Sequence, residues 1–359
     1  MSPVPLVFVP GFMGSDLFET DARGNFVRRI WPPVSYTPQG VAEFTGLDPL
    51  VDLPPDRKLA SADALLLGVY GGLLRRLYNL GYRTGESFWV YAYDWTQSNA
   101  QSGRGLAEFI NKLLAEHPSW RSVDVVSHSM GGIVTRAAIV FHKAPVRKAV
   151  YLATPHYGAP RAYFTLHPAA KTDLLGGWID QAAQFLWRWT LKMRAELGLK
   201  QKLKSIAQKV DSVYELLPDH HYLTPEYSMV TVRNGTRRYQ VTGVDATYYT
   251  DACRFPPSMQ ERVRQAMDFK DRLGQNVPGS HLLVYTGSVV TPDHVVYDVG
   301  PLARGFRTPR DSGNHGDDTV PTRSASVDSP DATRVEKATH NTLPNNRQAQ
   351  DLLAAFLSR

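Results

Sequence analysis

The chain has a single cysteine, Cys253, among 359 residues, so a fold held together by internal disulfide bonds is excluded. This cysteine content is consistent with a reducing compartment. The chain also lacks any run of the roughly 18 to 20 apolar residues that a membrane-spanning helix requires. Its first residues, MSPVPLVFVPGF, have no basic region of the kind found in signal peptides. We therefore expect a cytoplasmic protein, or a secreted one if a signal sequence has been removed.

Signatures of nucleic-acid and nucleotide binding are missing as well. The net charge is only +6, and the basic residues are mostly interspersed with other residues rather than gathered in a stripe. No helix-turn-helix, zinc-finger or RNA-binding pattern occurs, no GxGxxG follows a strand, and there is no GxxxxGK[ST] phosphate loop. We expect no nucleic-acid partner, no cofactor and no metal ion.

Strand and helix patterns alternate along the chain. Short β-rich apolar runs predict buried strands at residues 5–10, 88–93, 123–128, 148–154, 281–288 and 332–339. Apolar residues at helical spacing predict helices at residues 105–117, 130–143 and 346–357. Such alternation is typical of an α/β fold in which helices cover both faces of a mostly parallel sheet.

Two segments interrupt this alternation. Residues 32–60 begin with a proline-rich stretch and are predicted to form a lid-like loop. Residues 160–235 form a long insertion after the fourth predicted strand, which we expect to be a mostly helical cap. The core domain would then consist of residues 1–159 and 236–359.

The segment DVVSHSMGGIVTRAAI, residues 124–139, leads from a hydrophobic strand through small residues into a helix. Ser129 is at the apex of the turn, with Ser127 and Gly131 two positions to either side. This spacing is typical of a nucleophile elbow, with Ser127 in place of the usual first glycine. The amide of Met130, at the helix N-terminus, would point at a developing negative charge. The alternative is a tight strand–helix turn that has no catalytic role.

A serine hydroxyl becomes an effective nucleophile when a base takes its proton and donors receive the oxyanion. His340 follows a β-rich run, and an ordinary histidine can accept a proton at neutral pH. The segment GDDTVP, residues 316–321, offers a carboxylate to orient that ring. Either Asp317 or Asp318 could serve, and we favour Asp317 because Gly316 frees the backbone before it. The alternative for this segment is a solvated turn or a helix cap.

A second oxyanion donor is expected near the first strand. The segment VPGFMGS, residues 9–15, is a glycine-rich turn, and the amide that follows its Pro-Gly pair belongs to Phe12. A metal site at His315, Asp317 and Asp318 is an alternative without support from ligand spacing. We expect surface or packing roles for the other histidines, including His128, His156, His220, His221 and His315.

A set of ordered landmarks resembles the lecithin:cholesterol acyltransferase-like group of α/β-hydrolases, which includes lysosomal phospholipase A2-like enzymes. The landmarks are VPGFMGSDL (9–17), IWP (30–32), YAYDW (91–95), SHSMGG (127–132), ATPHYGAP (153–160), ELLP (215–218), VYTGSVVTP (284–292), GDDTVPTRSA (316–325) and His340. The resemblance implies an α/β-hydrolase fold with Ser129 as nucleophile, Asp317 as acid and His340 as base. It also implies an oxyanion hole built from the Phe12 and Met130 amides, together with a lid and a cap that bind acyl chains.

The predicted cap contains an aromatic cluster followed by a strongly basic stretch. If these aromatic side chains line an acyl pocket, they are candidate substrate-binding residues; the cluster includes Trp178, Phe185, Trp187 and Trp189. Alternatively, a basic helix with tryptophans can lie on an anionic membrane surface. Both interpretations fit a lipophilic ester or lipid as the substrate.

Three functions follow from these residues. The first is a serine carboxylester hydrolase of the lipase, esterase or phospholipase type, which forms an acyl-enzyme on Ser129 and releases the acid with water. The second is an acyltransferase, which passes the same acyl group to an alcohol. The third is a non-catalytic binding protein on a hydrolase fold, because a fold alone does not establish activity.

Overall fold

A six-stranded parallel sheet forms the centre of the molecule. The computed structural model describes residues 4–31, 34–36, 42–44, 58–65, 67–167, 204–224, 229–234, 237–241, 249, 255–299, 305–307 and 315–359. The strand order is β17-β12-β9-β8-β1-β7, and every pairing between neighbours is parallel. These strands are β1 (Leu6–Val9), β7 (Phe88–Val90), β8 (Val123–His128), β9 (Val146–Leu152), β12 (Ser280–Thr286) and β17 (Thr333–Val335). All six predicted strands therefore lie in one sheet, and the predicted α/β class with a mostly parallel sheet flanked by helices is confirmed.

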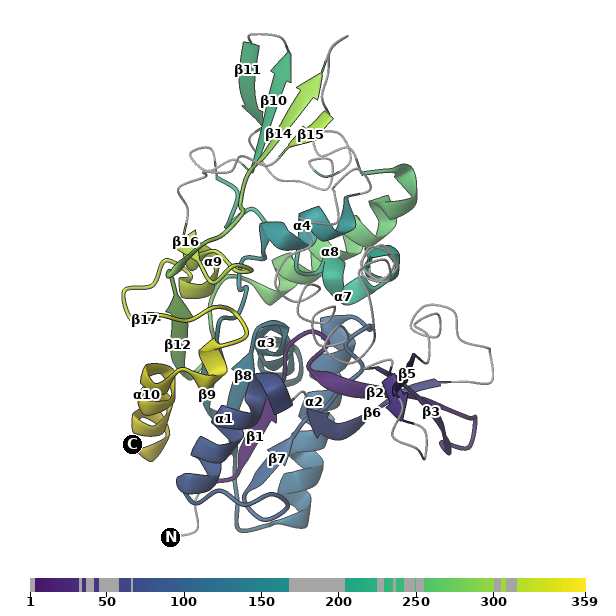
Figure 1. Cartoon of the computed structure of the whole chain (residues 1–359). Helices are drawn as coiled ribbons and strands as arrows, with labels where there is room; N and C mark the ends of the chain where they lie inside the picture. The colour runs from purple at the N-terminus through teal and green to yellow at the C-terminus, as the bar shows by residue number, and fades with distance from the viewer. Residues whose placement is uncertain are drawn as a thin grey trace.

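Helices cover both faces of this sheet, because side chains along each strand alternate between two apolar clusters. On one face Val7 and Val9 pack with α2 (Asn99–Glu116) and α3 (Met130–His142). On the other face Leu6 and Phe8 pack with α1 (Leu67–Asn79) and α10 (Arg347–Ser358). Figure 1 shows α1 and α10 on the side of the sheet that is nearer to the viewer.

The three predicted helices are present as α2, α3 and α10, and other helices accompany them in the described part of the chain. The predicted helix 105–117 begins earlier, at Asn99, because the hydroxyl of Ser98 caps α2 by accepting the Ala100 N–H at 3.1 Å. The sequence analysis did not identify α1, whose paired glycines weaken the helical pattern, or α8 (Gln260–Leu273), which is mostly polar. The last strand is shorter than predicted, so the residues between Val335 and His340 form a loop.

The predicted lid-like loop contains paired strands in the part that the structure describes. An antiparallel sheet joins β2 (Ser15–Thr20), β3 (Phe26–Trp31) and β6 (Lys58–Leu65). Two short strands, β4 (Val34–Tyr36) and β5 (Ala42–Phe44), pair with each other. The rest of residues 32–57 lies outside the described residues.

The predicted cap is described only in part, since residues 168–203 lie outside the described residues. Two of its helices are α4 (Pro160–Leu166) and α7 (Asp211–Tyr214). The predicted cap boundary at residue 235 falls between two paired strands of a second sheet. That sheet joins β11 (Arg237–Val241), β10 (Val230–Asn234), β14 (Val295–Val299) and β15 (Gly305–Arg307) (Figure 1).

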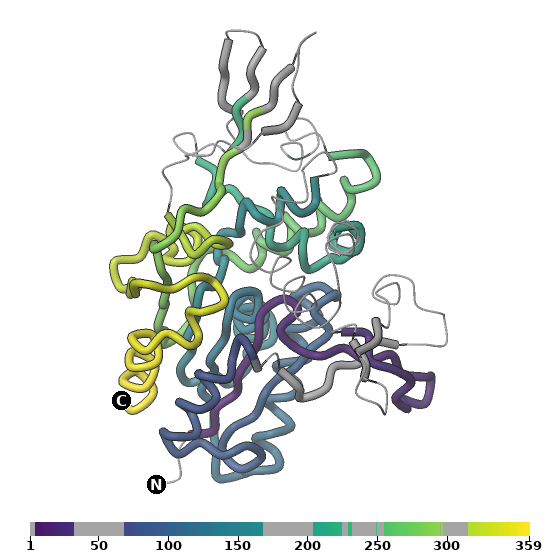
Figure 2. The backbone as a smooth tube through the Cα atoms, in the orientation of Figure 1, coloured from purple at the N-terminus to yellow at the C-terminus, as the bar shows by residue number. Residues whose placement is uncertain are grey.

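Segments that are distant in sequence meet beside the central sheet. Strand β12 pairs with β9, so the green segment at residues 280–286 runs beside the teal segment at residues 146–152 (Figure 2). The remaining short elements are β13 (Val289–Val290), β16 (His315–Gly316), α9 (Thr322–Ser326) and two 3₁₀ turns, Pro257–Met259 and Leu343–Asn345. Among the described residues, no helix has both the length and the apolar character needed to cross a membrane.

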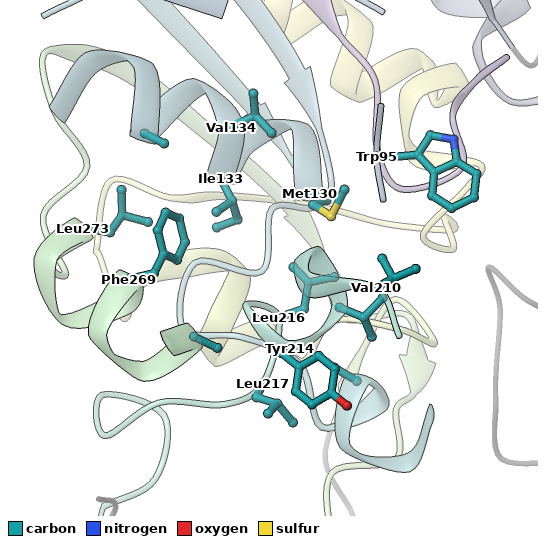
Figure 3. Packing of buried hydrophobic residues seen from close by; sticks show 14 of the residues in the cluster. Trp95, Met130, Ile133, Val134, Val210, Tyr214, Leu216, Leu217, Phe269 and Leu273 are labelled. Carbon is teal, nitrogen blue, oxygen red and sulfur yellow. The ribbon is translucent and has the colours of Figure 1, made fainter. Parts of the chain in front are cut away.

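The apolar core continues from the central sheet into the cap. In Figure 3, Met130 and Ile133 at the start of α3 face a group of side chains from α7, α8 and the segments beside them. The labelled members of that group are Val210, Tyr214, Leu216, Leu217, Phe269 and Leu273. Side chains of α7 and α8 are therefore packed directly against α3, the helix that follows Ser129.

A buried carboxylate also joins the cap to α2. The two side-chain oxygens of Glu215 accept hydrogen bonds from the Ser98 hydroxyl and from the Asn99 backbone N–H, both at 2.6 Å. An acidic side chain is favoured at a helix N-terminus. Burial nevertheless outweighs these bonds and raises the pKa of Glu215 to about 7.

Replacing Glu215 with Gln should weaken the pH dependence of stability. The pKa of Glu215 rises on folding from 4.5 to about 7. The contribution of this side chain to the free energy of unfolding is therefore fully present below pH 4.5 and is lost as the pH rises through 7. The free energy of unfolding should therefore fall by about 3 kcal/mol across that window in the wild type, and by less in Glu215→Gln. Urea unfolding at a series of pH values from 4.5 to 8 measures the difference. Glu108→Gln, on the exposed side of α2, is the control and should keep the wild-type dependence; equal dependence in Glu215→Gln would contradict the prediction.

Candidate active site

Ser129 occupies a strained turn between β8 and α3. Its backbone dihedral angles are φ 54° and ψ −129°, a conformation that L-residues with a side chain rarely adopt. The turn is held by its neighbours: the Ser129 N–H donates to the Leu152 carbonyl at 2.9 Å, and the Gly132 N–H donates to the Ser129 carbonyl at 2.9 Å. Strain of this kind persists only where the surrounding structure enforces it, and here it places a hydroxyl at the apex.

The small residues on either side of Ser129 have a steric reason. A Cβ at Gly131 would overlap the backbone carbonyls of Val9 and Pro10, because α3 begins directly against the end of β1. Ser127 is fully buried, and its hydroxyl donates to the Val150 carbonyl at 3.0 Å. The spacing that predicted an elbow therefore reflects the close approach of three backbone segments.

The structure brings Ser129, His340 and Asp317 together in one hydrogen-bonded chain. His340 Nε2 lies 2.8 Å from Ser129 Oγ, and His340 Nδ1 lies 2.7 Å from Asp317 Oδ2. Because a carboxylate only accepts, Nδ1 carries the proton and Nε2 is left to accept from the serine hydroxyl. Asp317 and His340 are 2% and 4% exposed, so this chain is shielded from water up to the partly exposed serine.

Asp317 is oriented by its own backbone. Its Oδ1 accepts the N–H groups of Thr319 at 2.9 Å and Val320 at 2.6 Å, which leaves Oδ2 for the histidine. The His340 N–H also donates to the Asp317 carbonyl at 2.7 Å. The carboxylate and the ring are therefore held by both main-chain and side-chain contacts.

Asp318, the alternative acid, is paired with Arg161. Its Oδ1 forms an ion pair with Arg161 Nη2 at 2.7 Å, and its carbonyl accepts a second bond from the same guanidinium. Asp318 has a positive φ of 81°. The side chains of Asp317 and Asp318 have different partners, His340 and Arg161. Of the two candidates, the geometry selects Asp317 as the neighbour of His340.

The predicted oxyanion donors belong to residues beside the elbow. Met130 is the first residue of α3 and directly follows Ser129. Phe12 follows Gly11, at which a Cβ would lie only 2.9 Å from the Ser129 Cβ. The segment around Phe12 is fixed by three side chains: the Tyr93 hydroxyl donates to Pro10, the Trp31 indole donates to Met13, and the Tyr70 hydroxyl accepts the Gly11 N–H, each at 3.0 Å.

The remaining histidines have other environments. His128 and His156 are buried, and both burial and neighbouring positive charge or imidazole lower their pKa values well below the usual range. His220 and His221 lie 3.4 Å from Asp271 and Asp219, while His315 is exposed in β16. Within the described residues, no group of three or more His, Cys, Asp or Glu side chains is arranged to hold a metal ion.

Some predicted site residues lie outside the described part of the chain, and two residues that contact the site were not predicted to do so. The candidate substrate-binding residues Trp178, Phe185, Trp187 and Trp189 lie outside the described residues. The sequence analysis missed Tyr70 and treated His128 as an ordinary packing residue, although both contact the site. Only the position of His128 next to Ser129 could have drawn attention to it, and nothing in the α1 sequence marks Tyr70.

Comparisons with known proteins agree with this architecture. Residues 86–170 match a family described as a PGAP1-like alpha/beta domain. Lecithin-cholesterol acyltransferase-like 4 of Arabidopsis thaliana is 24% identical over 217 residues, which cover 52% of this chain and 40% of that protein. The match thus spans less than half the length of that relative. The resemblance to lecithin:cholesterol acyltransferase-like α/β-hydrolases is therefore confirmed at the level of the group.

The fold is shared at low sequence identity with a solved structure, in agreement with the predicted α/β-hydrolase fold class. A chain in the crystal structure of the Tle4–Tli4 complex aligns over 99% of this chain and 98% of its own length, with a TM-score of 0.59 and 14% identity. The mature form of the Bacillus licheniformis lipase BlEst2 aligns over 99% of this chain and 92% of its own, with a TM-score of 0.45 and 14% identity.

Proposed function

We propose that this chain, which has an α/β-hydrolase fold and is similar to the lecithin:cholesterol acyltransferase-like group, is a serine carboxylester hydrolase that cleaves a hydrophobic acyl ester. The observation that carries the proposal is the hydrogen-bonded chain Ser129–His340–Asp317, with distances of 2.8 and 2.7 Å. A serine, a base and an orienting carboxylate in this arrangement are the parts required for acyl transfer through a covalent intermediate.

In the proposed mechanism, the Ser129 hydroxyl attacks the ester carbonyl while His340 Nε2 takes its proton. Asp317 holds the ring with its protonated nitrogen toward the carboxylate and stabilises the imidazolium. The amides of Phe12 and Met130 receive the oxyanion, and the N-terminus of α3 adds a favourable dipole. His340 then gives its proton to the departing alcohol. Water activated by the same histidine hydrolyses the acyl-enzyme and releases the acid.

An acyltransferase is the second candidate, supported by the name of the similar Arabidopsis thaliana protein, lecithin-cholesterol acyltransferase-like 4. Its chemistry is identical up to the acyl-enzyme, and only the acceptor differs. A third possibility, a non-catalytic binding protein, is disfavoured because the serine, histidine and carboxylate are all present and hydrogen-bonded. Peripheral membrane contact through the basic aromatic segment and a cytoplasmic location both stay predictions from the sequence.

Isotope labelling of the product should distinguish hydrolysis from transfer. The purified protein is incubated in ¹⁸O-water with a panel of phospholipids, acylglycerols and simple acyl esters, with and without a competing long-chain alcohol. A hydrolase releases free acid that carries one ¹⁸O from water, because water attacks the acyl-enzyme carbonyl. Mass spectrometry measures the acid and any new ester. New unlabelled ester at low alcohol concentration would indicate transferase activity, and no acyl product from any ester would contradict the proposed function.

A further inference from the structure

A buried tyrosine–histidine pair lies behind the proposed catalytic residues and contacts two of their loops. Tyr70 is on α1 and His128 is the last residue of β8, and both are at most 2% exposed. The Tyr70 hydroxyl lies 3.1 Å from His128 Nδ1, and it accepts the Gly11 N–H at 3.0 Å. On its other side, His128 Nε2 lies 2.9 Å from the His340 carbonyl oxygen.

These contacts define a single direction for every hydrogen bond. The His340 carbonyl can only accept, so His128 Nε2 carries a proton and donates to it. With the ring neutral, His128 Nδ1 is left as an acceptor, and the Tyr70 O–H donates to it. The Tyr70 oxygen in turn accepts the Gly11 N–H. The path Gly11–Tyr70–His128–His340 is thus complete, with each donor matched to an acceptor.

The neutral state of His128 follows from its surroundings. Burial, and to a smaller extent the neighbouring His340, lower the pKa of His128 well below the usual histidine range. The centroids of the two imidazole rings are only 4.9 Å apart. A charged His128 would therefore oppose the imidazolium that forms on His340 during the proposed reaction, whereas a neutral one donates a hydrogen bond without this cost.

We infer that Tyr70 and His128 are positioning residues for the proposed reaction: together they set the His340 backbone and the Gly11–Phe12 turn at a fixed distance from each other. This inference rests on the proposed function. His340 has to take the Ser129 proton while the Phe12 amide receives the oxyanion of the carbonyl that Ser129 attacks. The His340 loop and the Gly11–Phe12 turn therefore have to keep their relative position. A small displacement of either loop reduces the rate without removing any reacting group.

Substitution of Tyr70 with Phe removes one oxygen atom and both of its hydrogen bonds. Helix α1 stays attached to the His340 loop through other contacts, since Asn345 Oδ1 accepts the Leu73 N–H at 3.0 Å and Asn345 Nδ2 donates to the Val69 carbonyl at 2.7 Å. With a soluble p-nitrophenyl ester, Tyr70→Phe should lower kcat by about 10- to 100-fold and change KM by less than about two-fold. Leu77→Ala, two turns further along α1 and also buried, is the control. It should lower the melting temperature at least as much and leave kcat within about two-fold of the wild type.

Two substitutions of His128 separate positioning from packing. Gln can place an amide N–H near the site of Nε2 and donate to the His340 carbonyl, whereas Leu fills the space without a donor. His128→Gln should therefore keep several-fold more kcat than His128→Leu, even where Leu is the more stable of the two. Values of kcat that follow the melting temperatures of these variants would overturn the inference.

A readout independent of turnover is the proton that His340 Nδ1 shares with Asp317. In proton NMR spectra, this downfield resonance should exchange with solvent faster in Tyr70→Phe than in the wild type or in Leu77→Ala. Unchanged exchange in Tyr70→Phe would overturn the inference. If the wild type cleaved no ester, the proposed function would fail, while the exchange rates would still decide whether the pair holds His340 in place.

Discussion

Ser129→Ala should lower kcat for ester cleavage by about 10⁴- to 10⁶-fold and abolish covalent labelling by a fluorophosphonate probe. The substitution removes only the hydroxyl that lies 2.8 Å from His340 Nε2. Without it no acyl-enzyme forms, and the oxyanion donors alone support a small residual rate. Alanine fits the backbone of the elbow no worse than serine, so the fold should persist. Steady-state kinetics and intact-protein mass spectrometry after probe treatment measure the two effects.

The control for this prediction is Ser127→Ala, which is the same chemical change two residues earlier. The Ser127 hydroxyl donates to the Val150 carbonyl at 3.0 Å and makes no contact with His340. Its loss should cost about 1 kcal/mol of stability and leave labelling intact. If Ser129→Ala kept its labelling or turnover while Ser127→Ala lost both, Ser129 would not be the nucleophile.

Asp317→Asn should lower kcat by about 10⁴-fold through the tautomer of His340. The Thr319 and Val320 N–H groups donate to Oδ1 of residue 317, so the amide oxygen of Asn must stay at that position. Its NH₂ group is then directed at His340 Nδ1, which has to accept. The ring proton moves to Nε2, and Nε2 can no longer take the proton of Ser129. The pair of backbone donors makes this outcome specific, because the amide cannot rotate without losing both bonds.

Asp318→Asn is the matched control, since it makes the same change at the adjacent residue. It weakens the ion pair of Asp318 with Arg161 but leaves both Asp317 oxygens in place. We expect kcat to fall by less than about 10-fold, because partly exposed ion pairs contribute little. Kinetics of both variants with one soluble ester provide the measurement. A larger loss in Asp318→Asn than in Asp317→Asn would reverse the assignment of the acid.

Much of the architecture could be predicted from local sequence patterns. The six strands of the central sheet are short apolar runs. Because both faces of the sheet are buried, apolar residues run continuously along each strand and do not alternate with polar ones. The helices that were missed have weaker patterns: α1 contains paired glycines, and α8 is mostly polar because only one side is buried. The small antiparallel sheets depend on pairing between distant segments, for which single strands carry little signal.

Local sequence was sufficient to propose Ser129 as the nucleophile, because an elbow requires small residues at fixed offsets and a serine at its apex. It also proposed His340 as the base and one of two adjacent aspartates as the acid. The sequence favoured Asp317 only through the preceding Gly316, whereas the tertiary structure pairs Asp318 with Arg161 and places Asp317 against the histidine. The contacts of Tyr70 with Gly11 and His128 were likewise decided by the packing of α1 on the sheet. Sequence alone determined which chemical groups are present, whereas hydrogen-bond direction and distance arise where segments that are distant in sequence meet.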